Sequence, residues 1–505
     1  MNAQSDPKNY IENLWFPIDQ VFIGGAFVPP LGGQTHPLYD PSTGQQVGVI
    51  ARGDAQDIDR AVKAAHAGFS GPAPASDSPP WGQMSAQARG RVLFAIAAQI
   101  KQHSEDLARL EAIDVGKPLS QARADVAAMA RYFEFYGGAA DKVMGETIPY
   151  QRGYTVYTLR EALGVTGHIV PWNYPMQIIG RSVGASLAMG NCCVVKPAEQ
   201  ACLTVLALAG LTVAAGLPPG ALNIVPGLGV EAGAALAAHR EIAHVSFTGS
   251  VDTGKQVQAA ASTHVASVTL ELGGKSPQII FADADLERAA DFLLRAGIQN
   301  AGQTCSASSR LLVAEQVHEK VSAMMAERYR ALRAGPALEN FDLGPLISTQ
   351  QRARVGDFLS LAKDLHVLAE GQLAKDIPAQ GYYQPPVLLH CDDPHHTLAQ
   401  EEIFGPVQLV IPFTDEAQAI DIANGTRYGL VAAVWTRDGD RQLRMARALR
   451  AGQVFLNNYG AGGGVELPFG GVGESGHGRE KGFEALYGFS ALKTVAAHHG
   501  THDDT

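Results

Sequence analysis

The alternation of short apolar strands with helices between residues 165 and 313 constrains the fold of this chain more than any other feature. We predict strands at Val165–Val170, Leu222–Val225 and Ala243–Phe247, and a helix at Leu203–Ala215. Short apolar strands separated by helices are typical of a parallel sheet that is covered on both faces. The pattern therefore predicts an α/β fold.

A second alternating series follows the glycine pair Gly273-Gly274. We predict strands at Gln278–Phe281 and Arg310–Val313, with a helix at Leu286–Leu294 between them. A chain of 505 residues is too long for one ordinary domain. We therefore expect the glycine pair to be a hinge between two α/β domains.

The remaining segments have other patterns. Residues from Asp54 to Ala140 have the apolar spacing of helices, interrupted by a Pro/Ser-rich surface loop at Gly71–Pro80. Tyr154–Leu159 has a β-rich composition and is predicted to pair with Val165–Val170 as a hairpin arm. The glycine-rich segment Gly460–Gly478 is predicted to line a site.

Composition excludes several classes of function. A net charge of −11 argues against nucleic acid as a partner. No apolar run reaches the length of a membrane span, and the first residues lack the basic start and apolar core of a signal peptide. Five cysteines without zinc-like spacing indicate neither a disulfide framework nor a metal site. We expect a cytoplasmic protein without membrane or nucleic-acid partners.

One cysteine is a candidate nucleophile. Cys305 lies among small polar residues in GQTCSASSR, where a thiol is more accessible than in a core. Cys192, Cys193 and Cys202 have apolar neighbours and are expected in the core, whereas Cys391 has no predicted partner. A buried structural role for Cys305 explains its sequence context equally well.

Two further residues are candidates for catalysis. Glu271 ends an apolar strand, where burial can tune a carboxylate as a general base. An ion pair with Lys275 is the alternative. Asn173 lies between two prolines in PWNYP, which favours a preorganised oxyanion donor. A turn-forming asparagine is the alternative for this position.

Two short segments could hold a phosphate-bearing ligand. The sequence GSVDTG at 249–254 follows a strand and is expected to open a helix, whose N–H groups suit a diphosphate. An ordinary turn is the alternative. Lys196 and Glu199 lie just past a strand end, where nucleotides bind in parallel sheets, although a solvated loop has the same composition.

In this order, the motifs of the chain resemble those of the aldehyde dehydrogenase superfamily over about residues 20 to 495. The motifs are PWNYP (171–175), KPAE (196–199), FTGS (247–250), ELGGK (271–275), GQTC (302–305), EEIFGPV (401–407) and PFGG (468–471). The residues in these motifs resemble those of the class that oxidises aldehydes with water, which includes betaine, amino-aldehyde and semialdehyde enzymes.

The resemblance implies a Rossmann-type NAD-binding domain, an α/β catalytic domain and a small β oligomerisation arm in a homodimer or homotetramer. The implied parts are residues 1–143 with 164–273 for NAD, 274–458 for catalysis, 144–163 with 485–505 for the arm, and 459–484 as a substrate-side loop and bridge. The implied cofactor is NAD rather than NADP, because Glu199 suits a ribose 2′-hydroxyl and would repel a 2′-phosphate.

The resemblance also assigns residues to the reaction. Cys305 forms a thiohemiacetal and then a thioester with the aldehyde, Glu271 is the general base, and Asn173 donates to the oxyanion. The implied cofactor-binding residues are Trp172, Lys196, Glu199, Gly249, Ser250, Gly273, Glu402 and Phe404.

The chain departs from many relatives on the substrate side. Ser182 stands where many have a lysine thought to relay protons with the glutamate that matches Glu480. Arg181, eight residues after Asn173, resembles an arginine that binds the substrate carboxylate in succinate semialdehyde dehydrogenases. An internal salt bridge is the alternative for Arg181. Their second arginine is Gln299 here, and Tyr174 is a further candidate substrate contact.

The sequence therefore predicts an aldehyde dehydrogenase for a semialdehyde or another polar aldehyde. Three alternatives remain: an enzyme that passes the acyl group to coenzyme A, an inactive structural relative, and a cysteine hydrolase. The first class usually lacks the carboxylate at Glu271. An inactive relative does not need the full set of Asn173, Glu271 and Cys305. No histidine has a local signature that pairs it with Cys305, as a hydrolase requires.

Overall fold

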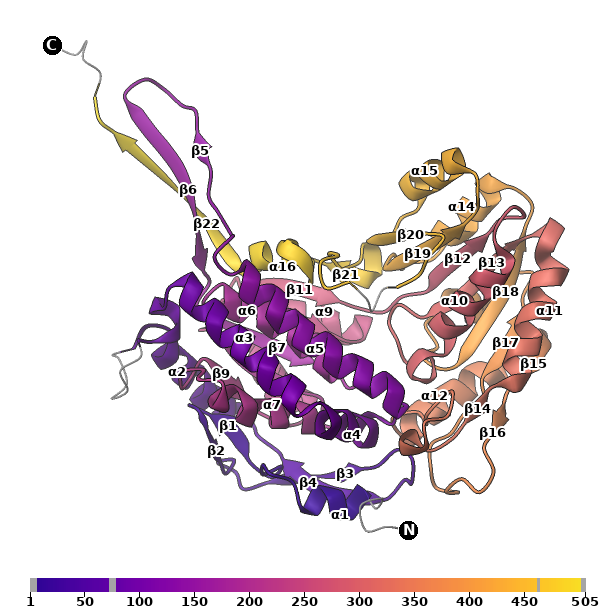
Figure 1. The fold of residues 1–505 in the computed structure, drawn as a ribbon, viewed down its shortest axis with the longest axis horizontal. Helices are drawn as coiled ribbons and strands as arrows, with labels where there is room; N and C mark the ends of the chain where they lie inside the picture. The colour runs from indigo at the N-terminus through magenta and orange to yellow at the C-terminus, as the bar shows by residue number, and fades with distance from the viewer. Residues whose placement is uncertain (1–6, 72–78, 461–463, 501–505) are drawn as a thin grey trace.

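The computed structural model describes residues 7–71, 79–460 and 464–500. Figure 1 shows two α/β lobes side by side and a long β arm that projects from the first of them. Most of the predicted loop Gly71–Pro80, and the centre of the glycine-rich segment at 461–463, lie outside the described residues. The predicted α/β class is confirmed.

The first lobe contains an eight-stranded sheet whose five central strands run parallel. Its order is β2 (Ala26–Val28), β1 (Val21–Ile23), β9 (Leu222–Ile224), β8 (Cys192–Pro197), β7 (Val165–Val170), β10 (His244–Thr248), β11 (Ser267–Glu271) and β21 (Gly476–His477). Every residue of β8, β9 and β10 is buried, since helices cover both faces of the sheet.

The helices of this lobe form layers on the two faces. On one face lie α2 (Ala55–Ser70), α8 (Ala234–Ala238) and α9 (Val251–Ser262). On the other lie α6 (Pro175–Ala188) and α7 (Leu203–Ala214), covered in turn by α3 (Ala86–Gln102), α4 (Ser104–Val115) and α5 (Leu119–Ala139). Figure 1 shows α3 and α5 as this outer layer.

The second lobe contains a seven-stranded, mostly parallel sheet. Its order is β15 (His366–Glu370), β17 (Val387–His390), β18 (Val407–Phe413), β13 (Ser308–Ala314), β12 (Ser276–Ile280), β19 (Val431–Trp435) and β20 (Gln453–Leu456). The helices packed against it are α10 (Leu286–Ile298), α11 (Glu315–Ala331), α14 (Glu416–Asn424) and α15 (Gly439–Ala448). Each lobe has its own large apolar core.

The arm corrects one expectation. Tyr154–Leu159 does not pair with Val165–Val170: it belongs to β6 (Tyr154–Ala162), which pairs with β5 (Thr147–Ile148) and β22 (Ser490–His498). The reason is burial. Strand β6 is exposed along much of its length, whereas β7 is buried between β8 and β10. Gly164, at φ 112°, separates the two strands.

The remaining α-helices and β-strands lie at the ends and edges of the lobes. They are α1 (Pro7–Glu12), the hairpin β3 (Thr35–Tyr39) and β4 (Gln46–Ala51), β14 (Arg333–Ala334), α12 (Thr349–Ser360), β16 (Gln372–Leu373), α13 (Thr397–Gln400) and α16 (Gly482–Gly488). The predicted domain boundaries stay predictions, although each of the three sheets described above draws its main strands from one predicted part of the chain.

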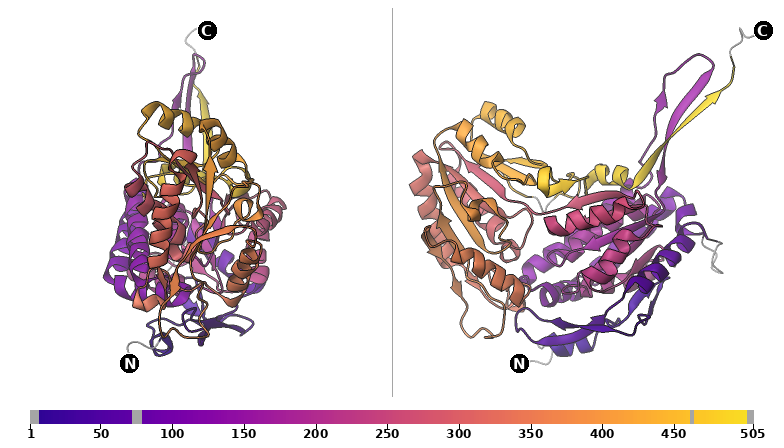
Figure 2. Two further views of the ribbon diagram at one scale, coloured as in Figure 1. Left: turned by 90° about the vertical axis from the view of Figure 1, so that its right-hand side faces the viewer. Right: turned by 180° about the vertical axis from the view of Figure 1, so that it is seen from behind.

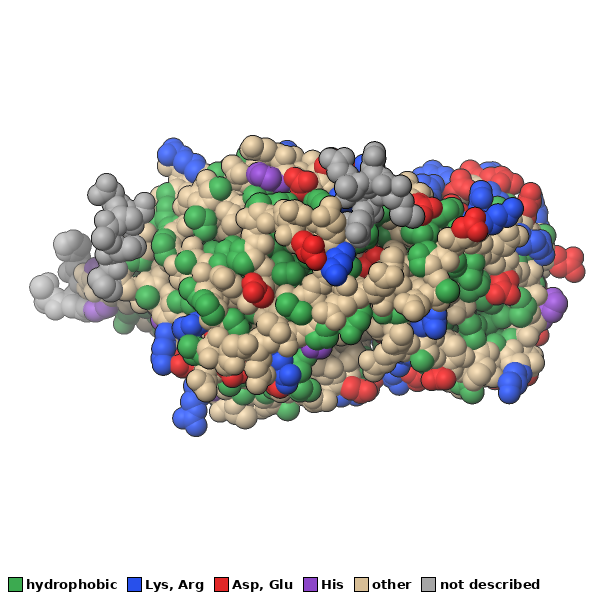
Figure 3. Space-filling model, turned by 90° about the horizontal axis from the view of Figure 1, so that it is seen from below, with side chains coloured by type: hydrophobic (Ala, Val, Ile, Leu, Met, Phe, Trp, Pro, Cys, Tyr) green, Lys and Arg blue, Asp and Glu red, His purple; other side chains and the backbone are tan. Residues whose placement is uncertain are grey.

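The views from other sides add two observations about the surface. Figure 2 shows the arm extending clear of both lobes. On the face in Figure 3, acidic and basic side chains are interspersed among apolar and neutral ones. Within the described ranges, no helix is long and apolar enough to cross a membrane.

Candidate active site

The candidate site lies where the two sheets meet. Parallel strands place their carboxyl ends at one edge of a sheet, and β7, β10 and β11 end there at Val170, Thr248 and Glu271. The chain then needs only four residues to reach Ser276, the start of β12. Cys305 lies in a turn just ahead of β13, so the amino ends of the second sheet face the carboxyl ends of the first.

A cavity of about 330 Å³ occupies this junction. Its lining residues include Trp172, Asn173, Gly249, Ser250, Gly273, Cys305, Glu402 and Phe404, all of which the sequence singled out. The fold thus brings together side chains that are up to 232 positions apart, the separation of Trp172 and Phe404. Both lobes contribute to its wall.

The glycine pair that links the lobes is required by close packing. A Cβ on Gly273 would lie 2.4 Å from a carboxylate oxygen of Glu402. A Cβ on Gly274 would lie 2.5 Å from the carbonyl oxygen of Cys305. Only glycine leaves room at both positions. The pair therefore lets Glu402 and the backbone of Cys305 pack directly against the segment that links the two lobes.

The turn before Cys305 is strained. Asn300, Ala301 and Gly302 all have positive φ, at 49°, 53° and 73°. Such a conformation in non-glycine residues costs on the order of 1–3 kcal/mol each and is found mostly at functional sites. The side-chain Nδ2 of Asn300 donates to the carbonyl of Asn173 at 3.0 Å, which holds this turn against the PWNYP loop. Sequence reasoning missed Asn300, because its signal is a backbone angle.

Asn173 faces the same turn from the other side. It is 5% exposed, and its Nδ2 donates to the carbonyl oxygen of Gln303 at 3.0 Å. This contact uses one of the two amide hydrogens and leaves the other for a further acceptor. Helix α6 begins two residues later at Pro175, which is favourable in a first helical turn. The loop therefore holds the amide in a fixed position.

Glu271 is a buried carboxyl without a hydrogen-bond partner. It is 1% exposed, and neither oxygen accepts a hydrogen bond from the described residues. The suggested ion pair with Lys275 is wrong, since the Lys275 ammonium also has no hydrogen-bond partner among the described residues. Burial raises the pKa of Glu271 well above its ordinary value, Glu480 raises it further, and Arg181 opposes the shift. Unsatisfied buried groups with shifted pKa values are typical of catalytic sites.

The thiol of Cys305 is half-buried, unlike the four other cysteines, which are buried. The expected core positions of Cys192, Cys193 and Cys202 are confirmed. Burial raises the pKa of the Cys305 thiol to about 12, Arg181 lowers it, and Glu402 and Glu271 raise it. The thiol therefore needs a base or a nearby positive charge to become a nucleophile.

The GSVDTG segment has the predicted geometry. Ser250 is the N-cap of α9, and its hydroxyl accepts a hydrogen bond from the Thr253 N–H at 3.3 Å. A Cβ on Gly249 would lie 2.5 Å from the ring of Phe247. The first turn of α9 borders the cavity, so its N–H groups are available to an anion there.

Lys196 and Glu199 contact each other at the end of β8. The Lys196 ammonium lies 2.9 Å from a Glu199 carboxylate oxygen, and Lys196 is 3% exposed. Neither residue lines the cavity around Cys305. Their predicted role with a ribose stays a prediction.

On the opposite wall, Glu402 and Phe404 lie in the loop before β18. Glu402 accepts a hydrogen bond from the Gly274 N–H at 2.9 Å, and burial raises the pKa of its carboxyl to about 7. Phe404 has a positive φ of 59°, and its ring packs edge-on against Trp172 at 5.3 Å. These contacts join the loop before β18 in the second lobe to Trp172 in the first lobe and to the glycine pair between the lobes.

The three predicted substrate residues form an ion pair or hydrogen bonds with other residues of the protein. Arg181 is 6% exposed and forms an ion pair with Glu480, which is the alternative to a substrate role. The Tyr174 hydroxyl lies 2.9 Å from that of Thr304. The carbonyl of Gln299, at the end of α10, accepts from the Thr304 hydroxyl at 3.3 Å. Their contact with a substrate stays a prediction, and the pairing of Arg181 disfavours it.

Two aromatic residues beside Cys305 were missed. Cys305, Phe455 and Tyr459 pack against a small apolar cluster of Leu430, Val431 and Phe469. The Tyr459 hydroxyl donates to the carbonyl of Ser306. A signal for Tyr459 was available, because it directly precedes the glycine-rich segment Gly460–Gly478 that was expected to line a site.

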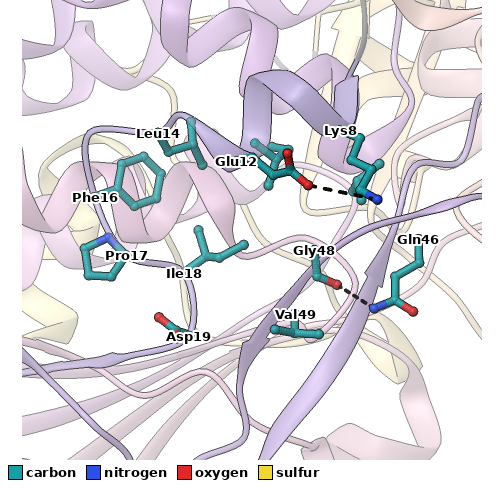
Figure 4. Close-up of a pocket in the computed structure, with 12 residues that line it drawn as sticks. Lys8, Glu12, Leu14, Phe16, Pro17, Ile18, Asp19, Gln46, Gly48 and Val49 are labelled. Atoms are coloured by element: carbon teal, nitrogen blue, oxygen red, sulfur yellow. Dashed lines mark hydrogen bonds and ion pairs between the residues drawn. The ribbon is translucent and has the colours of Figure 1, made fainter.

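Another pocket, of about 640 Å³, lies between α1 and β4 (Figure 4). Its polar side chains contact neighbouring groups: Lys8 lies 3.9 Å from Glu12, and Gln46 donates to the carbonyl of Gly48 at 3.2 Å. It is larger than the cavity at Cys305 but contains none of the predicted site residues. We therefore take the cavity at Cys305 as the site.

Comparisons with known proteins agree with this geometry. The model of the aldehyde dehydrogenase family matches residues 27–495. The chain is 42% identical over 480 residues to the mitochondrial aldehyde dehydrogenase family 2 member B4 of Arabidopsis thaliana, covering 94% of this chain and 87% of that protein.

Solved structures are similar as well. A candidate aldehyde dehydrogenase from Burkholderia cenocepacia is 60% identical, with a TM-score of 0.93 over 95% of this chain and all of that one. The NAD⁺ complex of an aldehyde dehydrogenase from Bacillus cereus is 38% identical, with a TM-score of 0.91 over 96% of this chain and 97% of that one.

Proposed function

The chain belongs to the aldehyde dehydrogenase family, and from this premise we propose that it oxidises an aldehyde to a carboxylic acid with NAD and water through Cys305. The observation that carries the proposal is the buried carboxyl of Glu271, which has no hydrogen-bond partner in the described structure. Such a group is costly unless the reaction uses it.

The residues present fit the cofactor. Gly249 and Gly273 line the cavity without a side chain, and the first turn of α9 offers N–H groups to a diphosphate. Ser250 and Gly249 would lie at the diphosphate, Lys196 and Glu199 at the adenosine ribose, and Glu402 at the nicotinamide ribose. Trp172 and Phe404 would border the nicotinamide. The similar Bacillus cereus enzyme has been solved with NAD⁺.

The chain's own residues supply the covalent chemistry. The Cys305 thiolate adds to the aldehyde carbon, and the remaining Asn173 amide hydrogen donates to the oxyanion that forms. A donor of this kind is worth roughly 3–4 kcal/mol in the transition state. NAD supplies the hydride acceptor. Glu271 then takes a proton from the water that cleaves the Cys305 thioester, which releases the acid and restores the thiol.

We further propose the finer properties of the enzyme. NAD is preferred to NADP, since the Glu199 carboxylate would repel a 2′-phosphate. The substrate is a polar aldehyde, for which the polar Tyr174 and Gln299 near Cys305 are the remaining candidate contacts. The arm joins copies into a homodimer or homotetramer, and the protein acts in the cytoplasm without a membrane or nucleic-acid partner.

The test is an assay of the purified protein with matched neutral and carboxylated aldehydes. Formation of NADH is followed by absorbance with NAD or NADP, and with and without coenzyme A. We expect turnover with NAD that does not need coenzyme A, and a lower kcat/KM with NADP. Cys305→Ala is expected to lose turnover and retain NAD binding, because other residues hold the cofactor. Turnover of this variant within tenfold of the parent would contradict the proposal.

A further inference from the structure

A buried ion pair lies beside the proposed catalytic groups, and the proposed chemistry does not use it. Arg181 projects from α6, and Glu480 lies in the segment between β21 and α16. Their exposed fractions are 6% and 0%, and the guanidinium Nε contacts a Glu480 carboxylate oxygen. The other carboxylate oxygen accepts from the Ser246 hydroxyl at 2.7 Å. Both charges are therefore fixed in position.

The Arg181 guanidinium lies close to Glu271, which ends strand β11 of the first sheet. Its NH2 group donates to the Thr248 hydroxyl at 3.2 Å, and Thr248 on β10 is the direct partner of Glu271 on β11. Neighbouring strands are about 4.8 Å apart. A positive charge bound to Thr248 therefore acts on the Glu271 carboxyl across a short, buried distance.

The same guanidinium borders the nucleophile. Its central carbon lies 5.1 Å from the centre of the Phe469 ring, and Cys305 packs against the cluster that contains Phe469. The backbone of Phe469 is hydrogen-bonded in both directions to that of Glu480, at 2.7 and 2.8 Å. One rigid unit thus joins Arg181, Glu480 and the wall behind the thiol.

The other charges and titratable groups around this unit come from every neighbouring element. They are Tyr132 and Tyr136 on α5, Tyr174 just before α6, Glu402 before β18, Tyr459 after β20, and Arg479 and Lys481 beside Glu480. Lys481 is 1% exposed, lies 5.1 Å from the Phe469 ring, and has a backbone at φ 63° and ψ 166° that is almost confined to glycine. Burial lowers the pKa of Lys481 to about 7, and Arg181 lowers it as well. Both arginines of the group keep their charge: Arg479 lowers the pKa of Glu271, whereas Arg181 lowers the pKa of both Glu271 and Cys305.

We propose that Arg181 is a positioning residue whose fixed charge favours the thiolate of Cys305 and the carboxylate of Glu271, with Glu480 as its anchor. The proposal rests on the proposed roles of Cys305 and Glu271. It replaces a substrate contact by an internal electrostatic role for Arg181. An arginine stays protonated, so it acts as a charge and does not pass protons. Ser182 takes no part, because its hydroxyl donates to the carbonyl of Ile178 in its own helix at 2.9 Å.

The test measures alkylation of Cys305 by iodoacetamide in the full-length protein without cofactor, from about pH 6 to about pH 10. Mass spectrometry identifies the modified residue. Arg181→Gln is expected to slow alkylation at least about tenfold at fixed pH, which corresponds to a thiol pKa higher by about one unit. Arg181→Lys keeps a positive charge and is expected to restore most of the rate. The pH profile of kcat is expected to move to higher pH in Arg181→Gln, because the carboxylate of Glu271 loses its cation.

Two variants separate this charge from a merely structural contact. Glu480→Gln also breaks the ion pair but keeps the cation, so alkylation is expected to be at least as fast as in the parent. The double variant Arg181→Gln, Glu480→Gln leaves neither member of this pair as an unpaired charge, which favours folding, and it is expected to be as slow as Arg181→Gln. Equal slowing by Arg181→Gln and Glu480→Gln, or a parental rate in the double variant, would overturn the proposal.

Arg123→Gln removes an exposed pair with Glu105 and serves as the matched control, with no expected change. The outcome for Arg181 is also distinct from failure of the proposed function. If alkylation of Cys305 left turnover of the parent intact, the role of Cys305 would be wrong, whatever the Arg181 variants did.

Discussion

Glu271 is buried and accepts no hydrogen bond within the described residues, and burial raises the pKa of its carboxyl well above the ordinary value. Arg181 opposes that effect. A raised pKa makes the Glu271 carboxylate a stronger base, which favours its proposed task of taking a proton from the water that cleaves the thioester. We therefore expect Glu271 to affect hydrolysis of the Cys305 thioester more than formation of the thioester.

Glu271→Gln is expected to trap the acyl-enzyme. The amide keeps the size of the side chain but cannot take a proton from water, so hydride transfer proceeds once and the thioester persists. After mixing with aldehyde and NAD, mass spectrometry should find the acyl mass on Cys305, with kcat lowered at least about a hundredfold. Asp114→Asn, at a buried carboxyl remote from the cavity, is the control and should accumulate no adduct. Hydride transfer without an adduct would exclude Glu271 as the base.

At the scale of elements, a buried charge cluster joins the helices that support the PWNYP loop. Lys117, between α4 and α5, contacts Glu111 at 2.9 Å and also contacts Asp125, and all three are at most 2% exposed. Its ammonium lies 4.1 Å from the centre of the Tyr174 ring. Gln177 on α6 donates to Asp125 at 2.6 Å. The cluster therefore fixes α4, α5 and α6 relative to one another.

Lys117→Met should lower the free energy of unfolding by about 3–5 kcal/mol, because it leaves two buried carboxyls without their cation. Urea unfolding followed by circular dichroism is the measurement. Lys101→Met, which removes an exposed pair with Glu134, is the control and should leave the midpoint nearly unchanged. A loss no larger than that of the control would show that the cluster does not stabilise the helices.

At the scale of the whole molecule, the arm carries apolar side chains that this chain leaves uncovered. Leu159 is 40% and Leu492 is 56% exposed, and Tyr150 is 64% exposed. Figure 2 shows that neither lobe reaches the arm along most of its length. Exposed apolar side chains on a projecting sheet are typical of an interface.

The double variant Leu159→Asp, Leu492→Asp is therefore expected to reduce the assembled mass, because it places charges in the proposed interface. Sedimentation velocity measures the effect. Leu443→Asp is the control, since Leu443 is 66% exposed on α15 and is expected to tolerate a charge. A mass unchanged from the parent would assign assembly to another surface.

The sequence by itself determined the elements and the chemical groups. The apolar segments that form β7 through β13 are short and bounded by glycine, proline or helical periodicity, so local pattern was enough to predict them. Local context made Cys305, Glu271 and Asn173 candidates with a structural alternative for each, and the resemblance of the ordered motifs assigned their roles. The cavity brings Asn173 and Cys305 together, and Glu271 ends the strand beside it.

Tertiary structure decided what depends on contacts between distant segments. The partner of β6 is β22, more than 300 residues away, and sequence spacing carries no information about such a pair. The left-handed turn at Asn300 and Ala301 exists because the surrounding packing offsets its strain. Arg181 has the same charge in any fold. Only the position of Glu480 beside it turned a candidate substrate contact into an internal ion pair, because burial makes an unpaired charge far costlier than a paired one.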